Sequence, residues 1–294
     1  MESIIDLEDL LNYIDEGILV VDKFANVVTF NNKALDMEGI EKESLIGRNT
    51  LDIFRGYTEN TSPIYRVLKQ KKSIINHYGN FTNKVNGYKG SFLASTIPLF
   101  ENDELVGAVD IYKDITKLEN VTYESYERSS AIYKVDDIVG NSKSISNLRK
   151  KISKISDSDS PVLVYGETGV GKELVVQSIH NSSKRKNNVF IAQNCAALPK
   201  NLLESILFGT TEGSFTGAKN KPGLFELANN GTLFLDEMNS LDVDLQAKLL
   251  RVIQQGIVRR LGDVRTHKVN TRIITSMNID PTNAIKENKL RKDL

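Results

Sequence analysis

The alternation of apolar and polar residues divides the chain into two stretches with different predicted folds. In the first stretch, apolar positions recur at helical spacing near residues 4–14 and 64–72, and the acidic stretch before Gly47 also has a helical pattern. Strand-like runs occupy residues 18–21, 27–30, 73–78, 91–98 and 105–112. Alternating strands are typical of an antiparallel sheet with one face on a core, so residues 1–118 are predicted to form a small α+β domain.

From residue 137 to 294 the pattern changes to short apolar runs. These runs are interpreted as strands of a parallel sheet and occupy residues 160–165, 189–192, 232–237 and 271–277. The first has the continuous apolar character of a buried strand, and a helical pattern at 173–180 follows it. Strands that alternate with helices predict an α/β domain. Residues 119–136 are polar and lack turn signals, which predicts a helical linker.

A glycine-rich segment joins the strand at 160–165 to the helix after it. Its residues are Gly166, Glu167, Thr168, Gly169, Val170, Gly171, Lys172 and Glu173. Strand, glycine loop and helix are the context of a phosphate-binding loop, in which backbone N–H groups point at phosphate oxygens and the lysine reaches the β- and γ-phosphates. Glu173 stands where such loops usually carry a serine or threonine for magnesium. The motif alone therefore leaves a plain glycine turn as the alternative.

The strand at 232–237 ends in two adjacent carboxylates, Asp236 and Glu237. Ligands of open α/β sheets bind at the carboxyl ends of strands, and buried carboxylates are costly unless they are used or paired. With the glycine loop, the pair predicts a site for ATP and Mg²⁺, in which Asp236 holds the metal and Glu237 orients and deprotonates the attacking water. A solvated strand end is the alternative for the carboxylates taken alone.

Two asparagines are predicted at the same edge of the sheet. Asn194 follows the strand at 189–192, and Asn278 follows the strand at 271–277. A neutral amide there can hold a water molecule or sense the γ-phosphate without competing for its proton. Asparagine is also a common turn residue, so a purely structural role is the alternative.

Charge and cysteine content indicate the cellular setting. Residues 1–120 hold 13 basic and 19 acidic side chains, and the remainder holds 25 and 19, a net charge of +6 that is too mild to demonstrate nucleic-acid binding. The single cysteine, Cys195, excludes an intramolecular disulfide. The acidic N-terminus does not look like a signal peptide, and no apolar run is long enough to span a bilayer. A cytoplasmic protein without a membrane partner is predicted.

The first domain resembles PAS sensory domains over roughly residues 5–118. The resemblance rests on Gly-Ile-Leu-Val-Val-Asp from Gly17, Val-Val-Thr-Phe-Asn-Asn from Val27, and a closing Asp-Ile-Thr at 114–116. It implies a pocket for an unknown small ligand, flavin or haem, or a role in dimerisation. The light-sensing flavin type needs a cysteine on this domain, and none is present. For His77 two interpretations are a haem ligand and an ordinary sheet or surface histidine.

The second domain resembles the AAA+ ATPase domain of bacterial sigma-54-dependent activators. In that family Glu173 is the expected residue after the loop lysine. A further run is similar to the family's sigma-54 contact loop, Gly-Ala-Phe-Thr-Gly-Ala, and comprises Gly213, Ser214, Phe215, Thr216, Gly217 and Ala218. Segments at 194–199, 231–237 and 246–252 also match. A PAS domain ahead of such a module is similar to regulators of arginine utilisation.

The resemblance implies roles for single residues. Phe215 and Thr216 would contact sigma-54 in its complex with RNA polymerase. Asn194 would restrain Glu237 until ATP is seated, and Asn278 would be a sensor, although Met277 replaces the threonine common before it. Arg291 would be an arginine finger for a neighbouring subunit's ATP, which implies a homo-oligomeric ring, a hexamer in the intact parent.

The sequence departs from the family at its end. It stops at Leu294, whereas the family continues with a second arginine, a helical lid and a helix-turn-helix for DNA. We therefore expect an incomplete lid and an activator fragment that lacks the DNA-binding element. One alternative is a nucleotide-binding sensor or dimeriser that does not turn ATP over. Another is an unrelated P-loop enzyme such as a small-molecule kinase, which leaves the loop around Phe215 unexplained.

Overall fold

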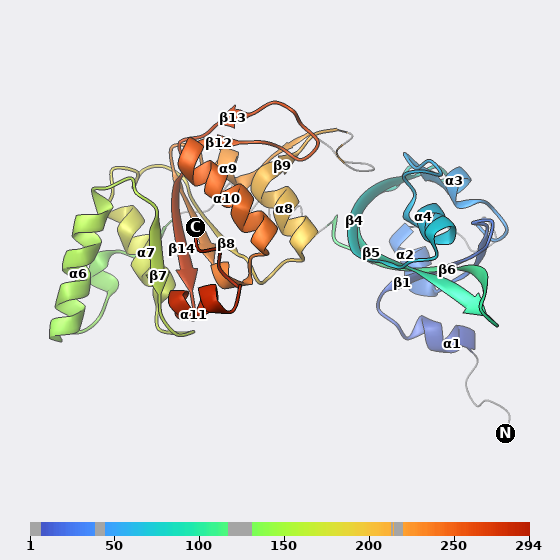
Figure 1. The fold of residues 1–294 in the computed structure, drawn as a ribbon, viewed down its shortest axis with the longest axis horizontal. Coiled ribbons are helices and arrows are strands. Elements are labelled where there is room, and N and C mark those ends of the chain that lie inside the picture. The colour runs from blue at the N-terminus through green and yellow to red at the C-terminus, as the bar shows by residue number, and fades with distance from the viewer. Residues whose placement is uncertain (1–6, 39–44, 117–130, 213, 215–219) are drawn as a thin grey trace, which may run out of the picture. The chain divides into compact units, whose positions relative to one another are not determined.

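The computed structural model describes residues 7–38, 45–116, 131–212, 214 and 220–294 of the chain. Its elements fall into two compact units, with α1 to β6 in the first and η2 to α11 in the second (Figure 1). Within these described residues, no helix combines the length and the apolar character needed to cross a membrane.

The first unit is a six-stranded antiparallel sheet with the strand order β2-β1-β6-β5-β4-β3. Its strands are β1 (Gly17–Asp22), β2 (Val27–Phe30), β3 (Phe54–Arg55), β4 (Ile74–Asn83), β5 (Lys89–Glu101) and β6 (Glu104–Asp114). Its helices are α1 (Leu7–Asn12), α2 (Asn32–Glu38), α3 (Thr50–Ile53) and α4 (Pro63–Gln70). The α+β prediction is confirmed, and α4 lies inside the curve of β4 and β5 (Figure 1).

The core of the first unit lies between the sheet and these helices. It includes Val21, Ile53 and Val67, which are at most 2% exposed. Asn31 is a buried polar residue of this unit, and its Oδ1 accepts from the backbone N–H groups of Ile18 and Ala34 at 2.9 and 3.0 Å. The asparagine therefore joins β1 to the first turn of α2.

The second unit is built on a four-stranded parallel sheet with the order β7-β14-β11-β8. These strands are β7 (Val162–Tyr165), β8 (Phe190–Asn194), β11 (Thr232–Asp236) and β14 (Arg272–Met277). The longer helices are α6 (Lys143–Ser156), α7 (Lys172–Asn181), α8 (Lys200–Phe208) and α10 (Val243–Gln255). Short elements are η2 (Val135–Asp137), α9 (Leu224–Leu227), η3 (Met238–Ser240) and α11 (Pro281–Lys286).

Helices cover both faces of this parallel sheet. Figure 1 shows α6 and α7 on one side and α8, α9 and α10 on the other. The layer under α6 and α7 is closed by buried Ile152, Ile179, Phe234 and Ile274. This arrangement leaves the two ends of the strands uncovered by the helical layers, as expected of an α/β fold whose ligands bind at the carboxyl ends of the strands.

One strand differs from its sequence interpretation. The run at 160–165 was predicted to be a buried strand, but Leu163 and Tyr165 of β7 are 42% and 53% exposed. These side chains are exposed because β7 forms an edge of the described sheet and pairs only with β14. Leu163 and Tyr165 alternate along the strand with the half-buried Val162 and Val164.

Most of the helical linker predicted at 119–136 lies outside the described residues, because the structure does not describe residues 117–130. Residues 131–134 have no regular structure, and Val135–Asp137 form a 3₁₀ turn. The boundaries of the linker and of the two domains stay predictions.

Candidate nucleotide site

The glycine-rich segment spans the gap between β7 and α7, as the sequence predicts. Gly169 and Gly171 have φ angles of +83° and +88°, a left-handed conformation that other residues rarely adopt. No atom lies within 4 Å of a Cβ built at either position, so backbone conformation rather than crowding requires glycine. Gly171 is the N-cap of the ten-residue α7, which places the loop at the positive end of a helix dipole.

Lys172 begins α7 and its side chain folds back over the loop. Its Nζ donates to the carbonyl oxygens of Gly166 and Glu167, both at 2.9 Å. The ammonium group therefore lies at the mouth of the loop, where phosphate oxygens can take the place of these carbonyls. The side chains of Glu167, Thr168 and Val170 are exposed.

Asp236 ends β11 and is oriented by its neighbours. Ser276 Oγ on β14 donates to Oδ1 of Asp236, and the backbone N–H of Glu237 donates to the same oxygen at 3.0 Å. Within the described residues, Oδ2 has no hydrogen-bond partner. A carboxylate held through one oxygen suits a magnesium site in which phosphates and water supply the other ligands. The described part of the chain holds no cluster of three or more metal-binding side chains.

Glu237 has an unusual backbone conformation directly after Asp236. Its φ and ψ are 54° and 46°, in the left-handed region that a glutamate adopts only where the surroundings hold it. Its N–H is held by Asp236 and lies 3.4 Å from Ser276 Oγ. Such strain clusters at functional sites, which favours a role for this carboxylate over a plain strand end.

The strand register places both predicted asparagines at this edge. Asn194 is the Cα partner of Asp236 in the parallel pairing of β8 and β11. Asn278 follows Met277, whose carbonyl oxygen accepts from the N–H of Gly166 at 3.2 Å. The loop, the carboxylates and both asparagines therefore share one edge of the sheet.

Neither asparagine makes its predicted functional contact directly. Oδ1 of Asn194 accepts from the N–H of Ala196 at 2.8 Å, which is a local turn. The N–H of Asn278 donates to Oδ1 of Asn239 at 3.4 Å. Restraint of Glu237 by Asn194 and sensing by Asn278 stay predictions.

Two family profiles match the chain, the Sigma-54 interaction domain over residues 138–294 and the PAS domain over residues 15–117. The chain belongs to the sigma-54 interaction domain family. The predicted order of a PAS domain followed by a P-loop domain on a parallel sheet is confirmed.

Individual proteins are similar over different lengths. Transcriptional activator RocR of Bacillus subtilis (strain 168) is 43% identical over 98% of this chain and 62% of that protein. A signal-transduction and transcriptional-control protein of Clostridium beijerinckii is 38% identical over 98% of this chain and 45% of that protein. The crystal structure of NtrX from Brucella abortus in complex with ATP is 34% identical, with a TM-score of 0.49, and covers 53% of this chain and 33% of that one. The chain spans less than two thirds of the length of these two curated relatives.

In the sigma-54 interaction domain, the predicted contact loop is described only in part. Gly213, Phe215, Thr216, Gly217 and Ala218 lie outside the described residues, and Ser214 is half-buried. The ends of the loop are held by a short antiparallel stem of β9 (Gly209–Thr210) and β10 (Lys221–Pro222). At its base a Cβ on Gly209 would lie 2.6 Å from the N of Gly223, so the two backbones approach too closely for a side chain.

A second hairpin of the sigma-54 interaction domain holds both ends of this loop. It is formed by β12 (Ile257–Val258) and β13 (His267–Lys268). Leu261 between them accepts from the N–H of Thr211 at 3.1 Å. Arg260 donates to Asn220 Oδ1 at 2.5 Å and makes a two-pronged ion pair with Glu226 at 2.8 and 2.7 Å.

Arg291, the predicted arginine finger, lies near the end of the described chain. Its guanidinium makes a two-pronged ion pair with Asp293 at 2.9 and 2.7 Å. Its N–H donates to Oε1 of Gln246 at 2.9 Å, and Gln246 is fully buried on α10. Whether Arg291 reaches a neighbouring subunit's ATP stays a prediction.

Sequence reasoning missed three polar residues that support this site. They are Ser276, Gln246 and Gln177, all at most 5% exposed. Each lies beside an apolar residue of its own strand or helix, and buried polar groups need partners. That pattern is visible in the sequence, although it does not name the partners.

Cys195 is buried beside the carboxylates and is 2% exposed. Its N–H donates to the carbonyl oxygen of Asp236 at 2.9 Å. Burial, with the charges of Asp236 and Glu237, raises the pKa of the thiol to about 12. The thiol is therefore neutral near pH 7.

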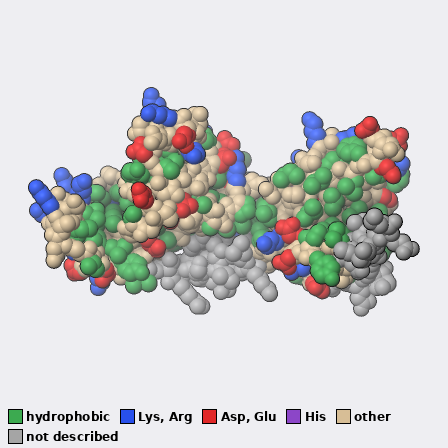
Figure 2. Space-filling model, turned by 90° about the horizontal axis from the view of Figure 1, so that it is seen from below, with side chains coloured by type: hydrophobic (Ala, Val, Ile, Leu, Met, Phe, Trp, Pro, Cys, Tyr) green, Lys and Arg blue, Asp and Glu red, His purple; other side chains and the backbone are tan. Residues whose placement is uncertain are grey.

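Basic side chains are dispersed on the face drawn in Figure 2. The described Lys and Arg residues form separate small groups there, one of them over α6. Within the second unit this distribution agrees with the mild net charge of the second half of the sequence.

Proposed function

We propose that this chain is the sensory and ATPase part of a sigma-54-dependent transcription activator, which hydrolyses ATP to remodel the RNA polymerase–sigma-54 complex. The shared sheet edge carries the proposal, because the loop of Lys172, the carboxylate of Asp236 and the strained Glu237 meet there. In this proposal the PAS domain receives the signal, with amino-acid catabolism as the controlled process.

Each residue at this edge of the sheet has a separate role in the proposed reaction. Backbone N–H groups of the loop and the Lys172 ammonium bind the triphosphate, and the Oδ2 atom of Asp236 holds Mg²⁺. The metal, when bound, neutralises charge on the β- and γ-phosphate oxygens. Glu237 orients the attacking water and accepts its proton, while Asn194 and Asn278 report whether the γ-phosphate is present.

The second hairpin would transmit a structural change at the ATP site to the sigma-54 contact loop. Glu237 leads through η3 and α10 into the hairpin, and the hairpin holds Thr211 and Asn220 at the two ends of the loop. A change of backbone at Glu237 would shift α10 and, through Leu261 and Arg260, the base of the loop. Phe215 and Thr216 would then move against sigma-54.

The intact activator would act as a ring, with Arg291 donated to the ATP of a neighbouring subunit. An arginine suits this role because it stays charged and forks across phosphate oxygens. One observation favours a second candidate function, nucleotide binding without turnover. The guanidinium of Arg291 is already engaged by Asp293 of the same chain, so it reaches a neighbour only if that ion pair opens.

ATP binding and phosphate release by the full chain test the proposal. Lys172→Ala should weaken MgATP binding at least about tenfold, because the charged group at the phosphates is lost. Glu237→Gln should bind MgATP normally and lose about 100-fold or more in hydrolysis. Lys186→Ala, an exposed lysine, is the control. Absence of MgATP binding by the unaltered chain would refute the proposal, and binding without hydrolysis at any protein concentration would favour the second candidate.

The sigma-54 contact needs its own measurement. Capture of purified sigma-54 in the presence of ATP should fall for Phe215→Ala and stay unchanged for Phe24→Ala, an exposed phenylalanine of the first unit. Equal capture by both variants would remove the loop assignment.

A further inference from the structure

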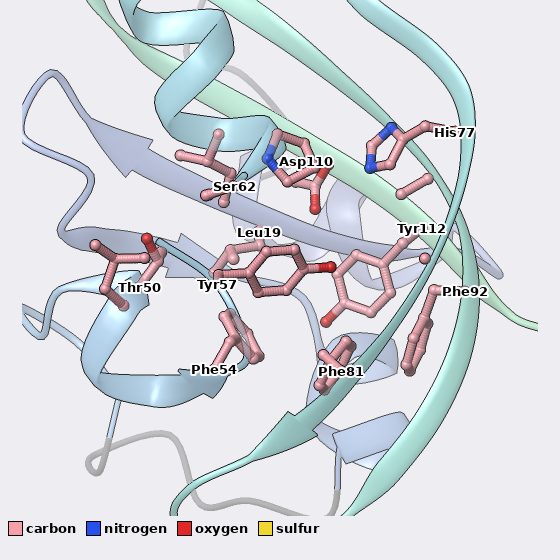
Figure 3. A pocket seen from close by; sticks show the side chains of 15 residues that line it. Leu19, Thr50, Phe54, Tyr57, Ser62, His77, Phe81, Phe92, Asp110 and Tyr112 are labelled. Atoms are coloured by element: carbon pink, nitrogen blue, oxygen red, sulfur yellow. The ribbon is translucent and has the colours of Figure 1, made fainter. Parts of the chain in front are cut away.

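A cavity inside the first unit has no part in the function proposed for the second. Its volume is about 50 Å³. Phe54, Phe81, Phe92 and Tyr112 form much of its wall (Figure 3). Phe81 and Phe92 are stacked with ring centroids 4.4 Å apart, and the edge of Tyr112 meets Phe92 at 5.3 Å. The wall is therefore largely aromatic.

Three polar side chains from different segments reach the same cavity. Asp110 lies on β6, His77 on β4, and Tyr57 between β3 and α4. Figure 3 shows the three projecting toward one another. Within the described residues, the only hydrogen bond to the Asp110 carboxylate comes from Thr96 Oγ1 at 2.6 Å. The cavity thus holds a carboxylate with most of its acceptor capacity unused.

Two further polar atoms among the lining residues lack partners. Nδ1 of His77 and Oγ1 of Thr50 are fully buried and make no hydrogen bond with the described residues. Unpaired buried polar atoms are rare in native proteins and call for a partner from outside the chain. Both atoms can act as acceptors, His77 in its neutral form, which burial favours by lowering its pKa although Asp110 opposes the shift.

We propose that this cavity binds a small organic cation, a primary ammonium on a short apolar chain, with Asp110 as its counter-ion. An ammonium group carries three donors, and the carboxylate of Asp110 and Nδ1 of His77, which lie near each other in Figure 3, supply acceptors for it. A cation also favours the ionised form of a carboxylate whose pKa burial raises, and it is attracted to aromatic ring faces. An anion would be repelled by Asp110 and would leave these acceptors unpaired.

The cavity limits the size of the ligand. A volume of about 50 Å³ is roughly a third of the 150 Å³ that holds a benzene molecule, so a few non-hydrogen atoms fit. A haem is far larger than this volume, so the size of the cavity favours the ordinary sheet-histidine interpretation of His77 over the haem-ligand one. The use of the cation as the activator's signal rests on the proposed function, whereas its binding does not.

Titration calorimetry of the full chain with ethylammonium chloride tests the proposal. We expect one site per chain, with a Kd no lower than about 0.5 mM, the limit that three non-hydrogen atoms allow. Ethanol, sodium acetate and potassium chloride at the same concentrations should show no site. Binding of ethanol or acetate as tight as that of ethylammonium would overturn the proposal, and this comparison needs no variant.

Asp110→Asn should weaken ethylammonium binding at least about tenfold, because the ion pair is lost. Asp103→Asn is the matched control, since Asp103 is exposed and its φ of 64° suits asparagine. Unchanged binding by a folded Asp110→Asn variant would overturn the proposal. MgATP binding measured on the same samples separates this outcome from the function proposed for the second unit.

Discussion

Gln177 on α7 connects Glu173, the residue after the loop lysine, to the segment that leads into the sigma-54 interaction domain. Its Nε2 donates to Oε1 of Glu173 at 3.0 Å, and its Oε1 accepts from the N–H groups of Ile132 and Tyr133 at 2.8 and 3.0 Å. One turn later Asn181 donates to the carbonyl oxygen of Tyr133 at 2.6 Å. The incoming segment is therefore fastened to the helix that begins with Lys172.

Replacing Gln177 should release this segment. A Gln177→Leu variant loses three hydrogen bonds of a side chain that is 5% exposed, so we expect a loss of about 1–3 kcal/mol in the free energy of unfolding. Hydrogen exchange at the amides of Ile132 and Tyr133 should become faster. Gln254→Leu, at an exposed position of α10, serves as the control. Unchanged exchange at both amides would show that Gln177 does not fasten the segment.

Ser276 should matter for the metal-dependent part of nucleotide binding. Ser276→Ala removes a donor to Asp236, so the carboxylate is held less firmly and MgATP affinity should fall several-fold, while affinity for ATP without Mg²⁺ stays nearly the same. Ser178→Ala is a matched control, because Ser178 is equally buried but its Oγ has no partner in the described residues. Equal losses of ATP affinity with and without Mg²⁺ would contradict this role of Ser276.

The stem below the sigma-54 loop should not tolerate a side chain at Gly223. A Cβ there would lie 2.5 Å from the carbonyl oxygen of Leu207, so Gly223→Ala must displace backbone at the base of the loop. We expect a loss of about 1–3 kcal/mol in stability and weaker capture of sigma-54, with MgATP binding retained. Gly87→Ala, where φ is +74° but no atom lies within 4 Å of the Cβ, should cost only about 1 kcal/mol of backbone strain. If Gly223→Ala captured sigma-54 as well as the unaltered chain does, the stem would not be needed to hold the loop for this contact.

Acid should destabilise the second unit through His180. This histidine is 1% exposed, its Nδ1 lies 2.9 Å from Thr232 Oγ1, and burial lowers its pKa from 6.5 to about 4. Protonation therefore opposes folding, so stability is complete above about pH 6.5 and declines as the pH falls toward 4. The melting temperature should fall by about 5 °C or more over this range.

The melting temperature of a His180→Asn variant should depend less on pH than that of the unaltered chain. His267→Gln, at a position whose side chain is one third exposed, should show the same pH dependence as the unaltered chain. Parallel melting curves for the two variants across this pH range would assign the acid sensitivity to another group.

Several strands of both units were predictable from short local patterns in the sequence. The runs at 27–30 and 91–98 have the pattern of half-buried strands, the run at 232–237 is continuously apolar up to its carboxylates, and each lies within or over an observed strand. The burial of each strand was harder to predict. The apolar run of β7 suits a central strand, but strand order places it at an edge, and order depends on contacts between residues more than 100 positions apart.

The sequence alone determined three features, the glycine-rich loop of Gly166 to Lys172, the Asp236–Glu237 pair and the order of the two domains. Each of them depends on residues that are adjacent in the sequence. Only the tertiary structure decided that Ser276 orients Asp236, that Gln246 holds Arg291, and that Asp110 and His77 share a cavity. Those relationships join separate elements, and a polar side chain's partner is set by strand register and packing rather than by its own identity.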